Sequence, residues 1–366
     1  MRIEEIDKNF AAAAFTRQDV KFYDVRKEPF RIYGLYNPVE EPVFRRMPGE
    51  VADAVSPRVS GLSLHTAGGR VRFKTNSPFI AIRAEMPELF PMSHMPRTGQ
   101  AGFAVYFNKN GQSTYYRTFK PDSLRLMEGK GITGIVEFVD IPEEDMRDVT
   151  VYFPLYGMVD SLYIGLQEDA EVLPGDTYKR EKPVVFYGSS ITQGGCASHP
   201  GNCYQGFLSR RFDFDYVNLG FSGNAKAEDA MIDYICGLDM SMFVYDYDHN
   251  APSLEHLRNT HDKMFRAIRA AHPDMPVIFM SAPNFDTNRD HWTPRRALIF
   301  ENYARAAAEG DKNVYYVDGE RLFGGDCRDG CTVDGCHPND LGFYRMADAV
   351  GATMEIIYSR EGCKYE

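Results

Sequence analysis

Four short polar stretches in the second half of the chain carry the residue types used in nucleophilic catalysis. Each comes after a segment that is predicted to be a strand, and they cover residues 188–194, 218–226, 245–252 and 332–340. In open sheets of parallel strands, ligands bind and reacting side chains lie at the carboxyl ends of the strands. The four stretches are therefore expected to supply one site.

Ser190 is the candidate nucleophile in the first stretch, Gly-Ser-Ser-Ile-Thr-Gln-Gly. A serine hydroxyl needs an adjacent base, and histidine is the usual base because its pKa lies near working pH. Asp334 and His337 are three residues apart, and on a turn leading into a helix this spacing can bring both side chains together. The carboxylate would then orient the imidazole and stabilise its charged form. The pattern predicts a triad of Ser190, His337 and Asp334, and the alternative is that Gly-Ser-Ser is only a turn.

The oxyanion of a tetrahedral intermediate needs hydrogen-bond donors that already point at it. Gly223 can offer a backbone N–H with no side chain in the way, and Asn250 can offer its side-chain amide. The backbone N–H of Ser190 would be the third donor. Asn250 could instead cap a helix, and Gly223 could be needed only for backbone conformation.

Taken together, these stretches resemble the SGNH/GDSL hydrolase superfamily. The family's blocks correspond, in the same order, to residues 188–194, 218–224, 250 and 334–337. The resemblance covers residues 184–350 and implies a three-layer α/β domain with a parallel sheet. It also implies ester hydrolysis through an acyl-enzyme on Ser190, with no metal or organic cofactor. The substrate implied is a small-molecule or oligosaccharide acyl ester, with an acetyl group on a carbohydrate as the first expectation.

Two positions depart from the family's pattern. Ser189 stands where the first block often has Asp, and it can still hydrogen-bond the turn. The third block is usually Gly-x-Asn-Asp but is Asp-His-Asn-Ala here, so Asp248 places a carboxylate near the expected pocket. Asp248 could disfavour anionic acyl groups or bind sugar hydroxyls, or it could point away and cap the helix expected after Ser253. His249 is next to Asn250 and is a second candidate for substrate contact, although it could equally be structural.

Trp292 is the only tryptophan and a third candidate for substrate contact. It lies in a polar stretch before a helix that Thr293 and Pro294 are expected to start, as cap and first-turn proline. An aromatic ring on such a loop can stack on a sugar. A core anchor or a helix staple is the favoured interpretation.

The second half alternates predicted strands and helices, which is typical of a parallel sheet covered on both faces. Strands are predicted at 184–187, 216–219, 242–246, 277–280 and 314–317. Helices are predicted at 204–212, 228–236, 253–272, 293–309 and 341–358.

The first half contains short predicted strands separated by turns, which indicates a β-sandwich of jelly-roll type. The strands are predicted at 20–24, 30–35, 61–65, 71–74, 79–85, 102–108, 114–119, 132–139, 149–153 and 161–166. Gly68-Gly69 and Asn110-Gly111 predict hairpin turns. Leu173-Pro174-Gly175-Asp176 breaks the pattern, so the predicted domains are 1–175, an accessory sandwich, and 176–366, the hydrolase domain.

Composition restricts the partners and the compartment. A net charge of −11 without a Lys/Arg-rich block argues against nucleic acid or an anionic membrane as the main partner. Apolar runs stay short of the roughly 18 residues of a membrane span, and the N-terminus lacks a signal-peptide core, so a cytoplasmic protein is expected.

Cys327, Cys331 and Cys336, with His337, could be metal ligands. Reduced thiols are favoured because the spacing is not that of two C-x-x-C pairs.

Two competing functions remain, and only the second uses the same catalytic residues. One is a catalytically silent carbohydrate-binding protein, in which the sandwich holds a glycan, and the other is an acyltransferase to a sugar alcohol. The segment 157–163, Gly-Met-Val-Asp-Ser-Leu-Tyr, is similar to the one that closes the sandwich before some SGNH domains. Several carbohydrate esterases share this two-domain plan. The sequence leaves open the acyl chain length, the alcohol, the oligomeric state and the role of the sandwich.

Overall fold

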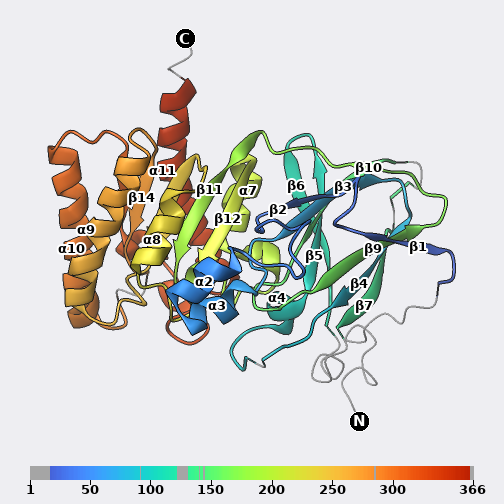
Figure 1. The fold of residues 1–366 in the computed structure, drawn as a ribbon, viewed down its shortest axis with the longest axis horizontal. Helices are drawn as coiled ribbons and strands as arrows, with labels where there is room; N and C mark the ends of the chain where they lie inside the picture. Colours follow the sequence, from blue (N-terminus) through green and yellow to red (C-terminus); the bar gives the residue numbers. More distant parts are fainter. Residues whose placement is uncertain are drawn as a thin grey trace.

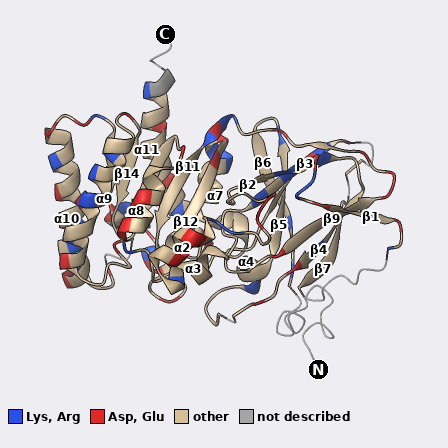
Figure 2. Cartoon of the chain, viewed as in Figure 1, with Lys and Arg blue, Asp and Glu red and all other residues tan. Residues whose placement is uncertain are grey.

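The computed structural model describes residues 17–90, 92–121, 131–139, 141–142, 145–283 and 286–362. Figure 1 shows a β-sandwich, formed by the first half of the chain, beside an α/β unit formed by the second half. Lys and Arg are interspersed with Asp and Glu over both parts (Figure 2). Among these residues, no helix has both the length and the apolar character required to cross a membrane.

Antiparallel strands form the sandwich. One sheet has the order β1 (Val20–Asp24), β9 (Ser161–Gln167), β4 (Phe79–Glu85) and β7 (Ile132–Glu137). The other has the order β10 (Val172–Pro174), β3 (Arg70–Thr75), β8 (Arg147–Tyr152), β5 (Phe103–Lys109) and β6 (Gln112–Phe119), and β2 (Arg31–Tyr33) also pairs with β3. Alternate residues, such as Val71 and Phe73 on β3 and Ile80 and Ile82 on β4, lie in a common core. These side chains face one another across the two sheets, which confirms the predicted sandwich.

Short helices also belong to the first half: α2 (Gly49–Val55), α3 (Pro57–Ser63) and α4 (Arg97–Ala101). The strand predicted at 61–65 is therefore wrong, because most of that segment lies in α3. The Oγ of Ser56 accepts the N–H of Val59 (3.2 Å) and Pro57 occupies the first turn, a combination that starts a helix. Asn110-Gly111 does join β5 and β6. Gly68-Gly69 does not join paired strands, so that hairpin prediction is also wrong.

The second half has the predicted parallel sheet, with the order β12 (Phe214–Gly220), β11 (Arg180–Gly188), β13 (Met242–Asp246), β14 (Val277–Met280) and β15 (Val314–Val317). The connecting helices are α6 (Ser190–Gln193), α7 (Tyr204–Phe212), α8 (Asp229–Cys236), α9 (Leu254–Ala271), α10 (Arg289–Ala308) and α11 (Asp340–Gly362). Short 3₁₀ turns cover Pro200–Asn202, Gly319–Arg321 and Arg328–Cys331. The boundary predicted between residues 175 and 176 lies between β10 and β11.

Helices cover both faces of this sheet. Val184 and Phe186 of β11 pack in a core with α7 and α11, whereas Val185 and Tyr187 pack in a second core with α8, α9 and α10. Successive side chains of a strand point to opposite faces, so a central strand must be apolar on both sides. The arrangement is the three-layer α/β domain that the sequence predicts.

Two buried arginines of the sandwich half cover the free edge of β12. Arg46 donates from Nη1 to the carbonyl oxygens of Asn218 (3.0 Å) and Gly220 (2.6 Å). Arg70 donates from Nη2 to the carbonyl oxygen of Tyr216 (3.2 Å). Both side chains are almost fully buried, at 1% and 0% exposure. Gly68 allows this close approach, because a Cβ there would lie 2.8 Å from the Cβ of Asn218.

Replacing Arg46 with Met is expected to lower the free energy of unfolding by about 2–4 kcal/mol. Buried carbonyl groups would lose their donor, and an unsatisfied buried polar group costs about 1–3 kcal/mol. Urea unfolding followed by circular dichroism measures the change. Arg58→Met is the control, since Arg58 is exposed on α3 and its replacement should change stability by less than about 0.5 kcal/mol. Equal stabilities of the two variants would contradict the role given to Arg46.

Candidate active site

Ser190 is placed by the sharp turn between β11 and α6. The Oγ of Ser189 accepts the N–H of Ile191 (3.1 Å) and so caps this short helix. Gly188 leaves no room for a side chain, since a Cβ there would lie 2.2 Å from the Oγ1 of Thr192. Ser190 therefore begins a fixed helical turn at the carboxyl end of β11.

His337 and Asp334 lie in the loop that precedes α11. Nε2 of His337 is 2.9 Å from Oγ of Ser190, and Nδ1 of His337 is 2.8 Å from Oδ2 of Asp334. The other carboxylate oxygen accepts the backbone N–H groups of His337 (2.7 Å) and Cys336 (3.0 Å). Asp334 thus fixes both the loop and the imidazole. The structure brings the three predicted triad residues into one hydrogen-bonded row.

The pKa of Asp334 is determined by opposing effects. Burial raises it, but hydrogen bonds from the backbone and ring N–H groups of His337 and from Cys336 outweigh burial and lower the pKa to about 2. Asp334 is therefore ionised at neutral pH and accepts a hydrogen bond from the protonated Nδ1 of His337. This leaves Nε2 of His337 as the acceptor that faces the Ser190 hydroxyl.

The loop after β12 carries Gly223, the predicted oxyanion glycine. Its φ is +69°, in the left-handed region that favours glycine, and a Cβ there would meet only open space. Nδ2 of Asn250 donates to the carbonyl oxygen of Phe221 (2.9 Å), which joins the third polar stretch to this loop. The amide nitrogen has a second N–H that can be directed at a substrate. The candidate donors thus lie on two loops that contact each other.

Gln193 connects these loops and has no role in the sequence prediction. Its Oε1 accepts the N–H of Ser222 (3.1 Å), and its Nε2 is 3.0 Å from Nδ1 of His65 in the sandwich half. Tyr156, also from that half, donates its hydroxyl to the carbonyl oxygen of Ser190 (3.2 Å). Gln193 could have been found as an amide inside the first block. No local pattern marks His65 or Tyr156.

Asp248 is buried, at 2% exposure, and lies beside the end of β14. Its Oδ2 accepts the N–H of Ala282 (2.9 Å), while Oδ1 has no hydrogen-bond partner among the described residues. Burial raises the pKa of Asp248 to about 6. It does not cap α9, because the Oγ of Ser253 accepts the N–H of His256 (3.0 Å) there. The cap considered for Asp248 is therefore wrong.

Trp292 lies in the first turn of α10 and not in a loop before it. The helix begins at Arg289, and the side chain of Asn288 caps it by accepting the N–H of His291 (3.2 Å). The predicted start at Thr293-Pro294 is wrong, since Pro294 lies inside the helix. The Trp292 and His249 rings have centroids 4.6 Å apart, so the two candidate contact residues are neighbours.

The cysteines near the C-terminus do not form a ligand group with each other in the described part of the chain. Cys327 is exposed, whereas Cys331 is buried, and the Cys331 thiol donates to the carbonyl oxygens of Phe323 (3.8 Å) and Cys327 (3.6 Å). The ligand group that the described residues do form contains His94, Cys196 and His337.

Asp246 lies at the end of β13, below the turn that carries Ser190. Its Oδ1 accepts the hydroxyl of Thr192 (2.8 Å) and its Oδ2 the hydroxyl of Tyr204 (3.4 Å). Burial, opposed by these hydrogen bonds and reinforced by Asp248, raises the pKa of Asp246 to about 7. The carboxyl group therefore binds its proton more tightly in the folded chain than in the unfolded chain.

A parallel sheet with a Ser–His–Asp row at its strand ends is the arrangement of serine-dependent hydrolases. Two family models match this chain. Residues 181–355 match the GDSL-like Lipase/Acylhydrolase family, and residues 20–172 match the N-terminus of Esterase_SGNH_hydro-type. The chain belongs to the SGNH/GDSL superfamily, in the form that has a separate N-terminal domain. The resemblance stated from sequence is confirmed.

Solved structures are similar over almost the whole chain. A GDSL-like lipase from Bacteroides ovatus is 27% identical, covers 93% of this chain and 98% of its own, and has a TM-score of 0.81. The salicylyl-acyltransferase SsfX3 from a tetracycline biosynthetic pathway is 19% identical, with 93% and 98% covered and a TM-score of 0.74. A family two carbohydrate esterase from Cellvibrio japonicus is 13% identical, with 92% and 98% covered and a TM-score of 0.57. None of the curated proteins compared with it matches this chain.

The raised pKa of Asp246 predicts that the free energy of unfolding depends on pH. Its folded pKa of about 7 exceeds the usual value near 3.8, so the stability that the Asp246 proton contributes is fully present below about pH 4 and is lost as the pH rises to about 7. Asp246→Asn should reduce this fall, by up to about 4 kcal/mol at about 1.4 kcal/mol per pH unit. Urea unfolding between pH 4.5 and 7.5 measures it, with the exposed Asp274→Asn as control. A wild-type pH slope retained in Asp246→Asn would contradict the assignment.

Proposed function

We propose that this protein is a serine esterase that removes short acyl groups from carbohydrates, with acetyl as the favoured acyl group. The observation that carries the proposal is the continuous row from Ser190 through His337 to Asp334, with contacts of 2.9 and 2.8 Å. A hydroxyl, a base and a carboxylate in this order can form and hydrolyse an acyl-enzyme.

The first half of the reaction acylates the enzyme. As Oγ of Ser190 attacks the acyl carbon, its proton moves to Nε2 of His337, and Asp334 stabilises the imidazolium. The backbone N–H groups of Ser190 and Gly223 and the amide of Asn250 stabilise the negative charge on the former carbonyl oxygen. When the intermediate collapses, the C–O bond to the alcohol breaks, and His337 returns the proton to the leaving oxygen.

The second half releases the acid. A water molecule takes the place of the alcohol and gives a proton to Nε2 of His337 as its oxygen attacks the acyl carbon. The bond to Oγ of Ser190 then breaks, and the proton returns to that oxygen. The products are a free alcohol and a carboxylic acid, and the side chains return to their initial protonation states.

The substrate class is inferred from two neighbouring aromatic rings, one of them next to Asn250 in the sequence, and from the shared two-domain plan. Trp292 and His249 present neighbouring rings on the loop that also carries Asn250 and on the helix beside it. Aromatic rings can pack on the C–H faces of sugars. Carbohydrate esterases, including an acetyl xylan esterase (Est2A) from the rumen bacterium Butyrivibrio proteoclasticus, share the fold at 11% identity and a TM-score of 0.54.

A panel of acetylated sugars and oligosaccharides tests the proposal. Wild type should release acetate, and Ser190→Ala should reduce kcat by about 10⁴-fold or more, because the nucleophile is lost. Acetate is quantified enzymatically, and added sugar alcohols reveal any transfer product. Equal rates for both proteins, or no activity on any ester, would refute the esterase. Activity confined to long acyl chains would refute the carbohydrate part, and dominant transfer would favour an acyltransferase.

Replacing Asn250 with Ala tests the oxyanion site. Loss of one donor that binds the developing charge should lower kcat by about 10²–10³-fold. Asn224→Ala is the matched control, because its amide donates to the carbonyl oxygen of Ser222 (2.6 Å) in the same loop. That control should lower kcat by less than about tenfold. Equal losses in the two variants would show that Asn250 only holds the loop.

A further inference from the structure

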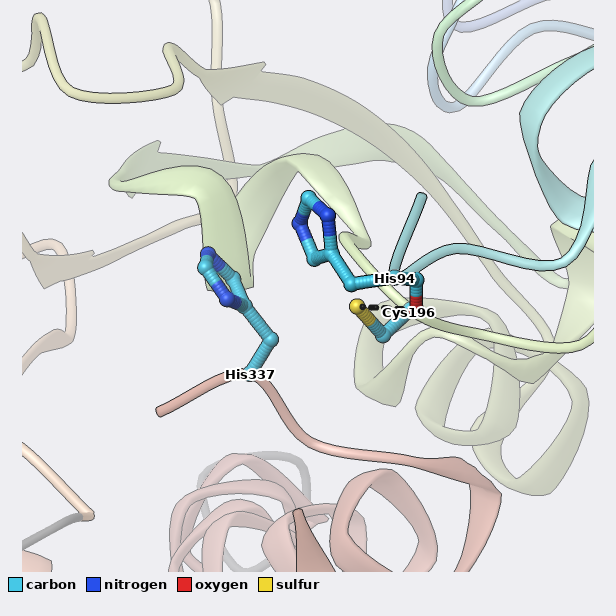
Figure 3. A group of neighbouring side chains, drawn as sticks. All are labelled: His94, Cys196 and His337. Carbon is cyan, nitrogen blue, oxygen red and sulfur yellow. Dashed lines mark hydrogen bonds between the residues drawn. The ribbon is translucent and has the colours of Figure 1, made fainter. Parts of the chain in front are cut away.

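A histidine and a cysteine that the proposed reaction does not use lie beside His337. His94 comes from the sandwich half, between β4 and α4, and Cys196 follows α6. One ring nitrogen of each histidine and Sγ of Cys196 all lie within 4.8 Å of one another. Figure 3 shows the three side chains gathered around one space, and the two imidazole rings have centroids 5.2 Å apart.

This group is held at the junction of the two halves. Sγ of Cys196 donates to the carbonyl oxygen of His94 (3.4 Å), the contact drawn as a dashed line in Figure 3. The backbone of Cys196 has a φ of +76°, a conformation that non-glycine residues rarely adopt. Helix α4 packs on the same turn, because a Cβ on Gly99 would lie 2.0 Å from the carbonyl oxygen of Ala197. The cysteine is thus fixed facing His94, at 2% exposure.

We propose that His94, Cys196 and His337 bind a divalent transition-metal ion, with Zn²⁺ as the representative, and that the bound ion blocks the esterase. Two imidazoles and a thiolate form a ligand set of intermediate softness, which suits Zn²⁺ and does not suit Mg²⁺ or Ca²⁺. The inhibitory part rests on the proposed function, whereas the site itself does not.

The ligand atom of His337 follows from the triad geometry. Nδ1 is 2.8 Å from Asp334, so Nε2 is the nitrogen that can bind a metal. Histidines that bind zinc usually donate their other ring N–H to a carboxylate or carbonyl, which is the role Asp334 already has. Nε2 is also the atom that must take the Ser190 proton. A metal ion and a catalytic proton therefore compete for one lone pair.

The distances require only a small closure. Bonds of 2.0–2.3 Å to a tetrahedral zinc ion put neighbouring ligand atoms about 3.5 Å apart, so the group must contract by roughly 1 Å. Oγ of Ser190, 2.9 Å from Nε2, or a water molecule is available for the fourth position. Binding replaces the S–H bond of Cys196 with a metal–sulfur bond and releases that proton to solvent. Burial, with Asp334 and Cys336 nearby, raises the pKa of Cys196 to about 12, so the thiol is protonated when no metal is bound.

Cobalt binding tests the site without any assay of activity. The probe is Co²⁺, added to the 366-residue chain that carries Ser190→Ala and has been freed of metal, because this variant retains all three ligands. One equivalent should produce a thiolate-to-cobalt charge-transfer band that Zn²⁺ then removes. When Cys196→Ser is combined with Ser190→Ala, the band should disappear. When His94→Ala is combined with Ser190→Ala, the apparent affinity for Co²⁺ should fall at least tenfold. It should persist in Cys327→Ser, which changes an exposed cysteine.

Inhibition tests the functional part. With wild type and an acetyl ester, Zn²⁺ should inhibit, and the half-inhibitory concentration should rise at least tenfold in His94→Ala and in Cys196→Ser. Each variant is compared with its own metal-free rate, its melting temperature is checked, and Cys327→Ser should behave like wild type. No cobalt band, or equal Zn²⁺ sensitivity in all variants, would overturn the site. A band without inhibition would overturn the block. A band in a chain that hydrolyses no ester would refute the proposed function and leave the site standing.

Discussion

The cover that the sandwich half places on the free edge of β12 is the constraint on which the rest of the structure depends. An edge strand presents unpaired carbonyl groups, and here those of alternate residues, Tyr216, Asn218 and Gly220, accept hydrogen bonds from Arg70 and Arg46. Burial lowers the pKa of Arg46 to about 9, so the guanidinium remains charged at neutral pH. Because β12 leads directly into the loop of Gly223, the same contacts position a candidate oxyanion donor. The sandwich is therefore part of the framework of the site.

The site itself consists of two small rigid units and one connector. Ser190 belongs to a capped helical turn, and Asp334 with His337 forms a loop that its own carboxylate closes. Each unit is fixed by bonds between close neighbours in sequence, so only their relative position depends on the rest of the fold. Gln193 links the first unit to the loop after β12 and, through His65, to the sandwich.

An Asp–His pair can serve a proton or a metal ion with the same geometry. Asp334 holds Nδ1 of His337, so Nε2 is the ring nitrogen that faces Ser190, and general-base catalysis and zinc ligation would both use this nitrogen. Metal binding also requires a nearby thiol and a second imidazole, which Cys196 and His94 supply here. His94 comes from the sandwich half, so the ligand group is complete only where the two halves meet. The junction between the two halves thus supports the candidate oxyanion loop and also places His94 beside the candidate base, His337.

Local patterns in the sequence determined the α/β half closely. Strands 242–246, 277–280 and 314–317 and helix 204–212 have the predicted bounds, because buried parallel strands are short apolar runs between helices with an apolar face. The candidate triad could likewise be predicted, because its members lie in two short blocks, one at the end of β11 and one in the loop before α11. The strand predicted at 61–65 is wrong because the helix start at Ser56 and Pro57 lies outside that segment, and this start places most of the segment in α3.

Contacts between distant segments were decided only by the tertiary structure. Arg46, His65 and His94 lie in the sandwich half with no periodic pattern around them. Their partners are more than 100 residues away along the chain, in β12, α6 and the His337 loop. Composition and periodicity report whether a residue is buried within its own element, but a side chain that crosses between two domains leaves no such signal.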